Sequence, residues 1–307
     1  MHIKGIQGKI ILLITSIIWG FAFVAQSKVA SYVDTFTLNF LRCFIGAIVL
    51  IPLIIVNCKK NKTPIFEANS KDKKHLIFAG FICAIFLCVG MSFQQFGISI
   101  YPEEAAASGR SGFITALYVV LVPLISVFLK RKLHLNSIIS CILATIGLYL
   151  LCFSKGIDHI YIGDFIVLIS AFGFALQILC IDKYSSSVNA IKLSFIQFIF
   201  CGLFSMILML IFENPNISKI IEVILPILYL GGVSSGIGYT LQIIGQKLSN
   251  NPTIDSIIMS LESLFAVIGG AIILNEKLLT NEIIGCILMF IAIIIAQLPI
   301  LAKKTKS

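Results

Sequence analysis

The stretch LKRKLHLNSIISCIL, residues Leu129–Leu143, recurs 145 positions later as LNEKLLTNEIIGCIL, residues Leu274–Leu288. Nine of the fifteen residues are identical between the two copies. A repeat of this kind in an apolar chain predicts an architecture built from two similar halves. The copies differ most where Arg131 is replaced by Glu276, so we expect the basic and the acidic copy to face opposite sides of a membrane.

The composition places the chain among membrane proteins. Of its 307 residues, 58% are hydrophobic and only 12% are charged, whereas soluble domains carry about 25% charged residues. The nine cysteines form no C-x-x-C pair, and the four histidines fall outside the apolar runs. We therefore expect no metal site, no cofactor and no Cys/His catalytic pair.

Ten apolar runs are each long enough to cross about 30 Å of hydrocarbon as a helix. Because every backbone group must be paired within lipid, we predict an all-α membrane protein with ten transmembrane helices. The predicted helices cover residues 9–27, 36–56, 76–98, 104–129, 135–153, 162–181, 189–212, 223–246, 253–274 and 280–301.

Positive charge predicts how the chain lies in the membrane. The side that holds the N-terminus carries 16 lysines and arginines, and the opposite side carries four. Because positive loops stay in the cytoplasm, we predict a multi-pass protein of the cell (plasma) membrane with both termini cytoplasmic.

The two halves correspond along most of their length. Residues Gly8–Phe40 align with Gly163–Phe195 at a constant offset of 155, and five predicted helices separate equivalent points. An odd number of crossings turns the second half upside down relative to the first. We therefore predict two inverted five-helix repeats, residues 1–157 and 158–307, with a substrate cavity near the middle of the membrane.

Four features carry a resemblance to a known family: SIIWGFAF at 16–23, Arg42, and the runs at 113–133 and 256–278. With these features the chain resembles the EamA-type members of the drug/metabolite transporter superfamily. The resemblance implies the ten-helix, five-plus-five fold and transport of a metabolite such as an amino acid, nucleoside, amine or drug.

One position departs from the pattern of that family. Many members have a proline after the glutamate of the ninth helix, whereas here Ser263 follows Glu262. Without the proline, we expect the kink and the exposed carbonyl groups to be absent at this point.

Charged residues within predicted helices are the strongest pointers to a transport site. Glu262 lies roughly 13 Å into the ninth helix, where its carboxyl group could exchange protons or bind a cation. The alternative is a structural hydrogen bond to a neighbouring helix. Asp255, on the same face, is interpreted mainly as a solvated helix start, with a place in the inner vestibule as the alternative.

Two arginines also lie within predicted helices. Arg110 could hold a substrate carboxylate through paired hydrogen bonds, or form a structural pair with Glu103 on the same helical face. For Arg42 we favour helix anchoring over substrate contact, because the family resemblance implies that the second and seventh helices are peripheral to the cavity.

Polar and aromatic residues recur at helical spacing in both halves, which predicts a shared cavity. Its aromatic members could form a wall for a cation, although any single one can equally be plain helix packing. With the two charged candidates, the predicted substrate-binding residues are Trp19, Gln94, Arg110, Tyr118, Gln177, Tyr239, Gln242 and Glu262, of which Glu262 is also the candidate for proton coupling.

These features support one function and leave two alternatives. The first is a secondary transporter, expected to export a small polar metabolite such as an amino acid by alternating access, with a zwitterion bridging Arg110 and Glu262. The second is uptake of an organic or quaternary amine such as choline, bound by Glu262 and the aromatic wall. The third is a non-transporting sensor or an enzyme, and the sequence contains no catalytic motif that would support it. We expect a small-molecule substrate and the lipid bilayer as partners and no nucleic acid; a homodimer stays open.

Overall fold

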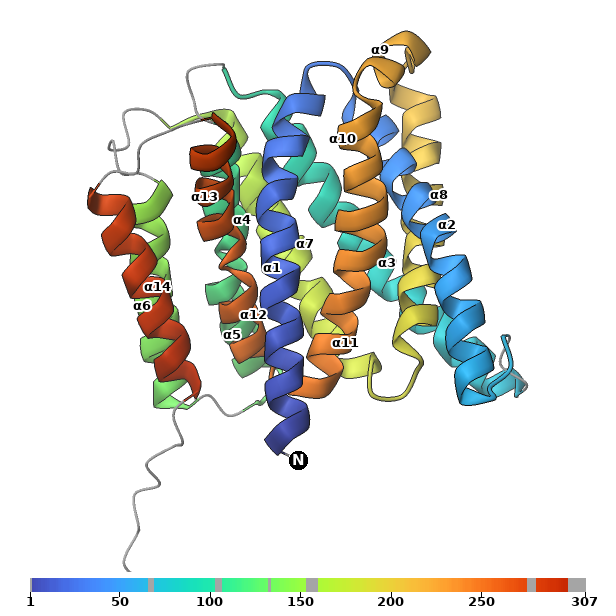
Figure 1. The fold of residues 1–307 in the computed structure, drawn as a ribbon, viewed down its shortest axis with the longest axis horizontal. Coiled ribbons are helices and arrows are strands. Elements are labelled where there is room, and N and C mark those ends of the chain that lie inside the picture. The colour runs from blue at the N-terminus through green and yellow to red at the C-terminus, as the bar shows by residue number, and fades with distance from the viewer. Residues whose placement is uncertain are drawn as a thin grey trace, which may run out of the picture.

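The computed structural model describes residues 2–65, 69–102, 107–131, 134–152, 160–274 and 280–297. Within these ranges the regular structure is helical and no strand forms (Figure 1). The elements are α1 (His2–Ala30), α2 (Thr35–Asn61), α3 (Ser70–Ser99), α4 (Ala107–Ala116), α5 (Tyr118–Phe128), α6 (Leu135–Cys152), α7 (Ile162–Tyr184), α8 (Ala190–Phe212), α9 (Ile217–Glu222), α10 (Ile224–Leu228), the π-helix η2 (Tyr229–Tyr239), α11 (Thr240–Ser249), α12 (Pro252–Met259), α13 (Glu262–Leu274) and α14 (Thr280–Gln297).

These elements make the ten predicted membrane crossings. In the described part of the chain, eight helical segments are long and apolar enough to span a membrane, and Leu135–Leu150 and Ile283–Ala296 form two shorter apolar helices. The predicted all-α fold is thereby confirmed. Because five crossings separate α1 from its equivalent α7, the two helices traverse the membrane in opposite directions. The predicted repeat boundary, between residues 157 and 158, lies outside the described residues.

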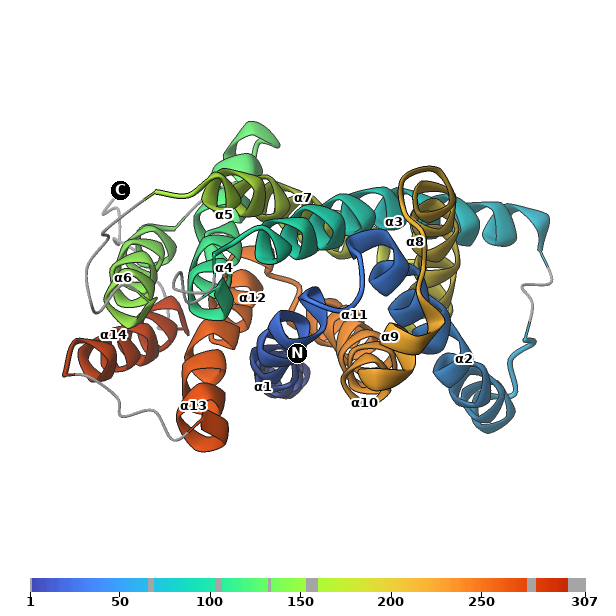
Figure 2. The ribbon, with the colours of Figure 1, turned by 90° about the horizontal axis from the view of Figure 1, so that it is seen from above.

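Two pairs of equivalent helices from the two repeats pack against each other. Seen from above, α6 and α14 form a pair at one end of the molecule, and α2 packs on α8 toward the other end (Figure 2). Between them lie α1, α7, α11 and the two interrupted crossings, α4–α5 and α12–α13. The centre of the molecule is therefore built from both repeats, as an interface between halves requires.

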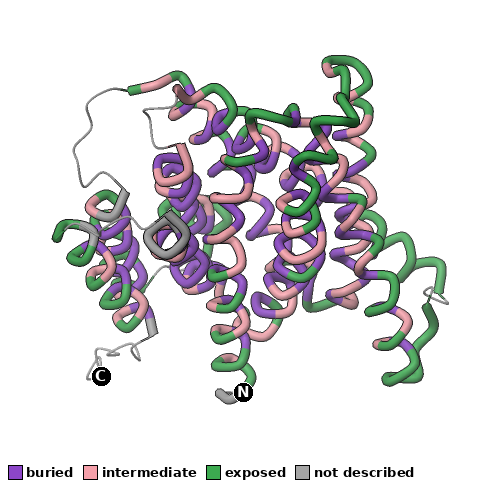
Figure 3. Tube along the Cα trace, turned by 45° about the horizontal axis from the view of Figure 1, so that its top comes forward, coloured by how far each residue is buried: buried purple, intermediate pink, exposed green. Residues whose placement is uncertain are grey.

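The outside of the bundle is apolar. Side chains such as Phe44, Ile48 and Leu210 are large and exposed, with Leu210 at 70%. Figure 3 shows buried residues along the inward parts of the helices and exposed residues around them. Such a continuous apolar exterior suits contact with lipid, where no aqueous surface has to be covered.

The fourth and ninth crossings are both interrupted near their middle. α4 gives way to α5 at Leu117, and α12 gives way to α13 at Ser260 and Leu261. The ninth crossing is therefore interrupted although no proline follows Glu262. At this break Ser260 Oγ donates to the Ile257 carbonyl at 2.8 Å, and just beyond it Ser263 Oγ donates to the Gly112 carbonyl of α4 at 2.8 Å.

The eighth crossing contains the π-helix η2, whose sequence YLGGVSSGIGY is rich in glycine. A π-helix is rare and widens the backbone, and it is often found at functional sites. Glycine lets this wide segment approach α2 closely: a Cβ at Gly231 would lie 2.6 Å from Ile45 Cβ. A Cβ at the neighbouring Gly232 would meet only Val49 Cγ2, at 3.9 Å.

Substitution of these two adjacent glycines separates the effect of close packing on stability from the effect of helix propensity. Because the new methyl group collides with Ile45, we expect Gly231→Ala to destabilise the protein by about 1–3 kcal/mol. Gly232→Ala is the matched control, since its methyl group meets only ordinary contact distances. Apparent melting temperatures of the two purified variants in detergent test this packing. Equal melting temperatures would show that η2 and α2 are not in close contact.

Candidate functional site

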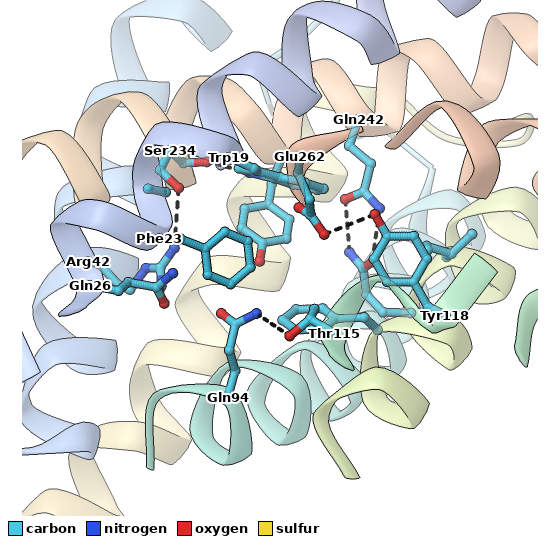
Figure 4. A pocket seen from close by; sticks show the side chains of 15 residues that line it. Trp19, Phe23, Gln26, Arg42, Gln94, Thr115, Tyr118, Ser234, Gln242 and Glu262 are labelled. Carbon is cyan, nitrogen blue, oxygen red and sulfur yellow. Dashed lines mark hydrogen bonds between the residues drawn. The ribbon is translucent and has the colours of Figure 1, made fainter. Parts of the chain in front are cut away.

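A cavity lies in the centre of the molecule, between the two repeats (Figure 4). Seven of the eight residues predicted to bind substrate line it, and Arg110 does not. The lining residues are Trp19, Ala22, Phe23, Gln26, Arg42, Gln94, Thr115, Tyr118, Phe174, Gln177, Ile178, Ser234, Tyr239, Gln242 and Glu262.

Glu262 and Tyr118 meet where the two interrupted crossings resume. Tyr118 is the first residue of α5 and Glu262 is the first residue of α13, so each begins the second half of an interrupted crossing. The Tyr118 hydroxyl donates to Glu262 Oε1 at 3.0 Å, and Glu262 is only 4% exposed.

Aromatic rings form one wall of the cavity. The rings of Trp19 and Tyr239 lie 4.7 Å apart between centroids, and Phe198 packs edge-on against Tyr239 at 5.8 Å. The indole Nε1 of Trp19 donates to the Ser234 carbonyl at 3.2 Å, which ties α1 to the π-helix. The wall is therefore held by packing and by a hydrogen bond across the two repeats.

Side-chain amides form another wall. Gln177 and Gln242 exchange two hydrogen bonds, of 3.3 and 3.0 Å, and Gln177 also donates to Gln197 at 3.3 Å. Gln94 donates to Thr115 Oγ1 at 3.1 Å. Amide groups can both donate and accept, so this lining suits a polar ligand of mixed character.

Arg42 reaches the cavity from α2. Its Nε donates to Ser235 Oγ at 3.0 Å, its Nη1 to Gln26 Oε1 at 3.2 Å and its Nη2 to Ser234 Oγ at 3.3 Å. The residue is 3% exposed. The prediction that α2 stays peripheral is therefore wrong at this residue, since Arg42 both anchors the helix and lines the cavity.

Other lining residues were not predicted from the sequence to bind substrate. Phe23 and Ser234 lie within strongly apolar or small-residue runs, and nothing in their immediate sequence distinguishes them from packing residues. Gln26 and Arg42 did carry a signal, because polar groups within a crossing are costly unless they have a partner or a role.

Arg110 lies at the start of α4 and pairs with Asp164 at the start of α7. Its Nη2 donates to Asp164 Oδ2 at 2.7 Å and its Nε to Oδ1 at 3.1 Å, while Tyr101 donates to Oδ1 at 2.6 Å. Burial and the Asp164 carboxylate raise the pKa of Tyr101, which keeps its hydroxyl a donor. The paired hydrogen bonds expected for a substrate go to Asp164 instead, and Glu103, the predicted partner, lies outside the described residues.

Asp255 is the fourth residue of α12, as Arg110 is the fourth residue of α4. It is fully buried, and neither of its carboxylate oxygens has a hydrogen-bond partner among the described residues. The interpretation of Asp255 as a solvated helix start is therefore wrong. It does not line the cavity described above.

Comparisons with known proteins agree with this architecture. The model of the EamA-like transporter family matches the chain twice, over residues 6–153 and 161–297. An uncharacterized transporter of Archaeoglobus fulgidus is 26% identical over 97% of this chain and 88% of its own. A biotin transporter of Escherichia coli K12 is 23% identical over 75% of this chain and 73% of its own. A solved crystal structure superposes with a TM-score of 0.72 at 16% identity, over 95% of this chain and 98% of the other, a likeness of fold alone.

A double-mutant cycle tests the structural role of Arg110. We expect Arg110→Gln and Asp164→Asn each to lower the melting temperature, and the double variant to lose less than the sum, with a coupling of about 0.5–3 kcal/mol. Arg131 and Asp182 form the control pair, because the Arg131 side chain is 40% exposed and such pairs couple by only about 0–1 kcal/mol. Strict additivity at Arg110 and Asp164 would contradict the pairing.

Proposed function

The chain belongs to the EamA-like transporter family, and on that premise we propose that it carries a small polar metabolite, such as an amino acid, through its central cavity by alternating access. The observation that supports this proposal is the convergence of both repeats on one cavity lined by aromatic rings, amides and two charged residues. Ligand sites at the interface of inverted repeats, beside interrupted helices, are the usual arrangement in secondary transporters.

The interrupted crossings supply the moving parts of this proposal. α4–α5 and α12–α13 are interrupted directly before Tyr118 and Glu262, and we propose that each half-helix tilts at these interruptions. Rocking of the two repeats about these breaks would open the cavity to one side and then to the other.

The direction of transport and the orientation of the protein in the membrane are part of the proposal. The charge asymmetry of the loops supports cytoplasmic termini in the cell membrane. Export is proposed from the family resemblance. Biotin, which the Escherichia coli relative is named for transporting, is itself a small polar metabolite and belongs among the ligands to be tested.

A second candidate substrate is an organic or quaternary amine. The carboxyl group of Glu262 and the paired rings of Trp19 and Tyr239 favour it, because a cation is attracted both by a carboxylate and by the face of an aromatic ring. In this alternative the amine would be taken up, and Arg42 would serve only to join α2 to η2.

Glu262 is the proposed site of proton coupling. Its carboxyl group is buried, lies on the cavity wall and has the Tyr118 hydroxyl as its hydrogen-bond donor. A buried carboxyl that faces substrate can bind a proton when the substrate leaves, since either occupant relieves the cost of an isolated buried charge.

Replacement of this carboxyl group tests the coupling. In proteoliposomes loaded with radiolabelled amino acids, biotin or choline, we expect Glu262→Gln to abolish the part of the flux driven by a pH gradient and to retain substrate exchange. Tyr118→Phe is the matched control, because it removes the hydrogen bond and leaves the carboxyl group. If Glu262→Gln kept the full response to the pH gradient, proton coupling at this residue would be excluded.

A further inference from the structure

The buried charge of Arg42 has no role of its own in the proposed function. Arg42 is 3% exposed, lies within a membrane crossing and faces the cavity. Its three hydrogen-bond partners, on Gln26, Ser234 and Ser235, are all neutral oxygens. No carboxylate of the described residues pairs with it.

The hydrogen bonds of Arg42 leave a specific part of it unused. A guanidinium group has five N–H donors: one on Nε and two on each terminal nitrogen. Its Nε and one N–H of each terminal nitrogen are engaged. One N–H on Nη1 and one on Nη2 remain, the two atoms with which an arginine holds a carboxylate.

The surroundings hold this group in a fixed position. Ser234 and Ser235 come from the π-helix, and the carbonyl of Ser234 is itself occupied by the Trp19 indole. Three hydrogen bonds on three atoms therefore orient the guanidinium before any ligand arrives. A donor that is ordered in advance binds more tightly, because less conformational entropy is lost on binding.

The buried charge of Arg42 also favours an anionic ligand. A buried charge without a partner is costly, and the cost is relieved when an anion binds beside it. The acidic residue of the cavity does not supply that anion, because Glu262 interacts with Tyr118 and not with Arg42. In Figure 4, Arg42 and Gln26 lie on one side of the cavity and Glu262 and Tyr118 on the other.

We infer that Arg42 is the residue that recognises a carboxylate on the substrate, and that this carboxylate is the missing partner of its charge. The inference rests on the proposed function and narrows it to metabolites that carry a carboxylate. The other polar group of such a molecule, an amine or an amide-like N–H group, faces Glu262. Arg42 thus has the carboxylate-binding role that the sequence predicted for Arg110.

Matched acid and amide ligands test this inference. The full-length protein in detergent is melted with biotin, with its primary amide, and with each proteinogenic amino acid and the corresponding amino-acid amide. A ligand that binds the folded state raises the melting temperature. We expect one or more free acids to stabilise the wild-type protein and the matching amide to do so much less. Arg42→Gln should bind that acid roughly 10- to 100-fold more weakly and lose the preference for acid over amide.

Two further variants keep the test decisive. Arg42→Lys retains the charge without the two-pronged geometry, so we expect a reduced but measurable preference for the acid even if Arg42→Gln does not fold. Arg131→Gln, an arginine outside the cavity, should leave the preference unchanged. Equal binding of acids and amides, a preference that survives Arg42→Gln, or binding of amines alone would overturn the inference while the proposed transport function stands. An absence of binding and of flux with acids, amides and amines alike would overturn the proposed function itself.

Discussion

The structure depends on one constraint, that every backbone N–H and C=O group within lipid must find a partner inside the protein. Continuous helices satisfy it along most of the ten crossings. Where α12 ends, the hydroxyl groups of Ser260 and Ser263 bond to backbone carbonyls, one of them on the neighbouring α4. Irregular backbone is tolerated at this depth because it is enclosed by other helices or borders a cavity.

The interruptions and the π-helix bring the functional groups together. The break in each repeat ends at a side chain that points into the cavity, Tyr118 in the first repeat and Glu262 in the second. The π-helix presents Ser234 and Ser235 to Arg42. The places where the helices depart from regular geometry are therefore the places that build the cavity, as expected when strain and irregularity concentrate at functional sites.

The two buried arginines of the described residues, Arg42 and Arg110, differ in their partners. Arg110 and Asp164 satisfy each other, and Tyr101 and the Tyr161 ring surround the pair. Such a pair joins α4 to α7 and has little capacity left for a ligand. Arg42, in contrast, is surrounded by neutral oxygens. This difference in partners, and not depth in the membrane, separates a structural arginine from a candidate binding residue.

The amino-acid sequence by itself determined the class of fold. Apolar runs of the right length, the duplication of LKRKLHLNSIISCIL and the number of crossings between equivalent points are properties of the linear chain, because a bilayer imposes one length and one kind of secondary structure. Helical periodicity also found part of the cavity: seven of its fifteen lining residues, among them Trp19 and Gln242, were predicted.

Only the tertiary structure decided the roles of the charged residues. Arg42 and Arg110 are alike in sequence terms, each a lone cation early in a crossing, and their roles depend on which side chains of other helices lie opposite. Asp164 is 54 residues from Arg110, and Ser235 is 193 residues from Arg42. The Ser263 hydroxyl likewise bonds to a carbonyl 151 residues away. Contacts between distant segments leave no local pattern, so the partners of each buried charge emerge only when the two repeats are packed together.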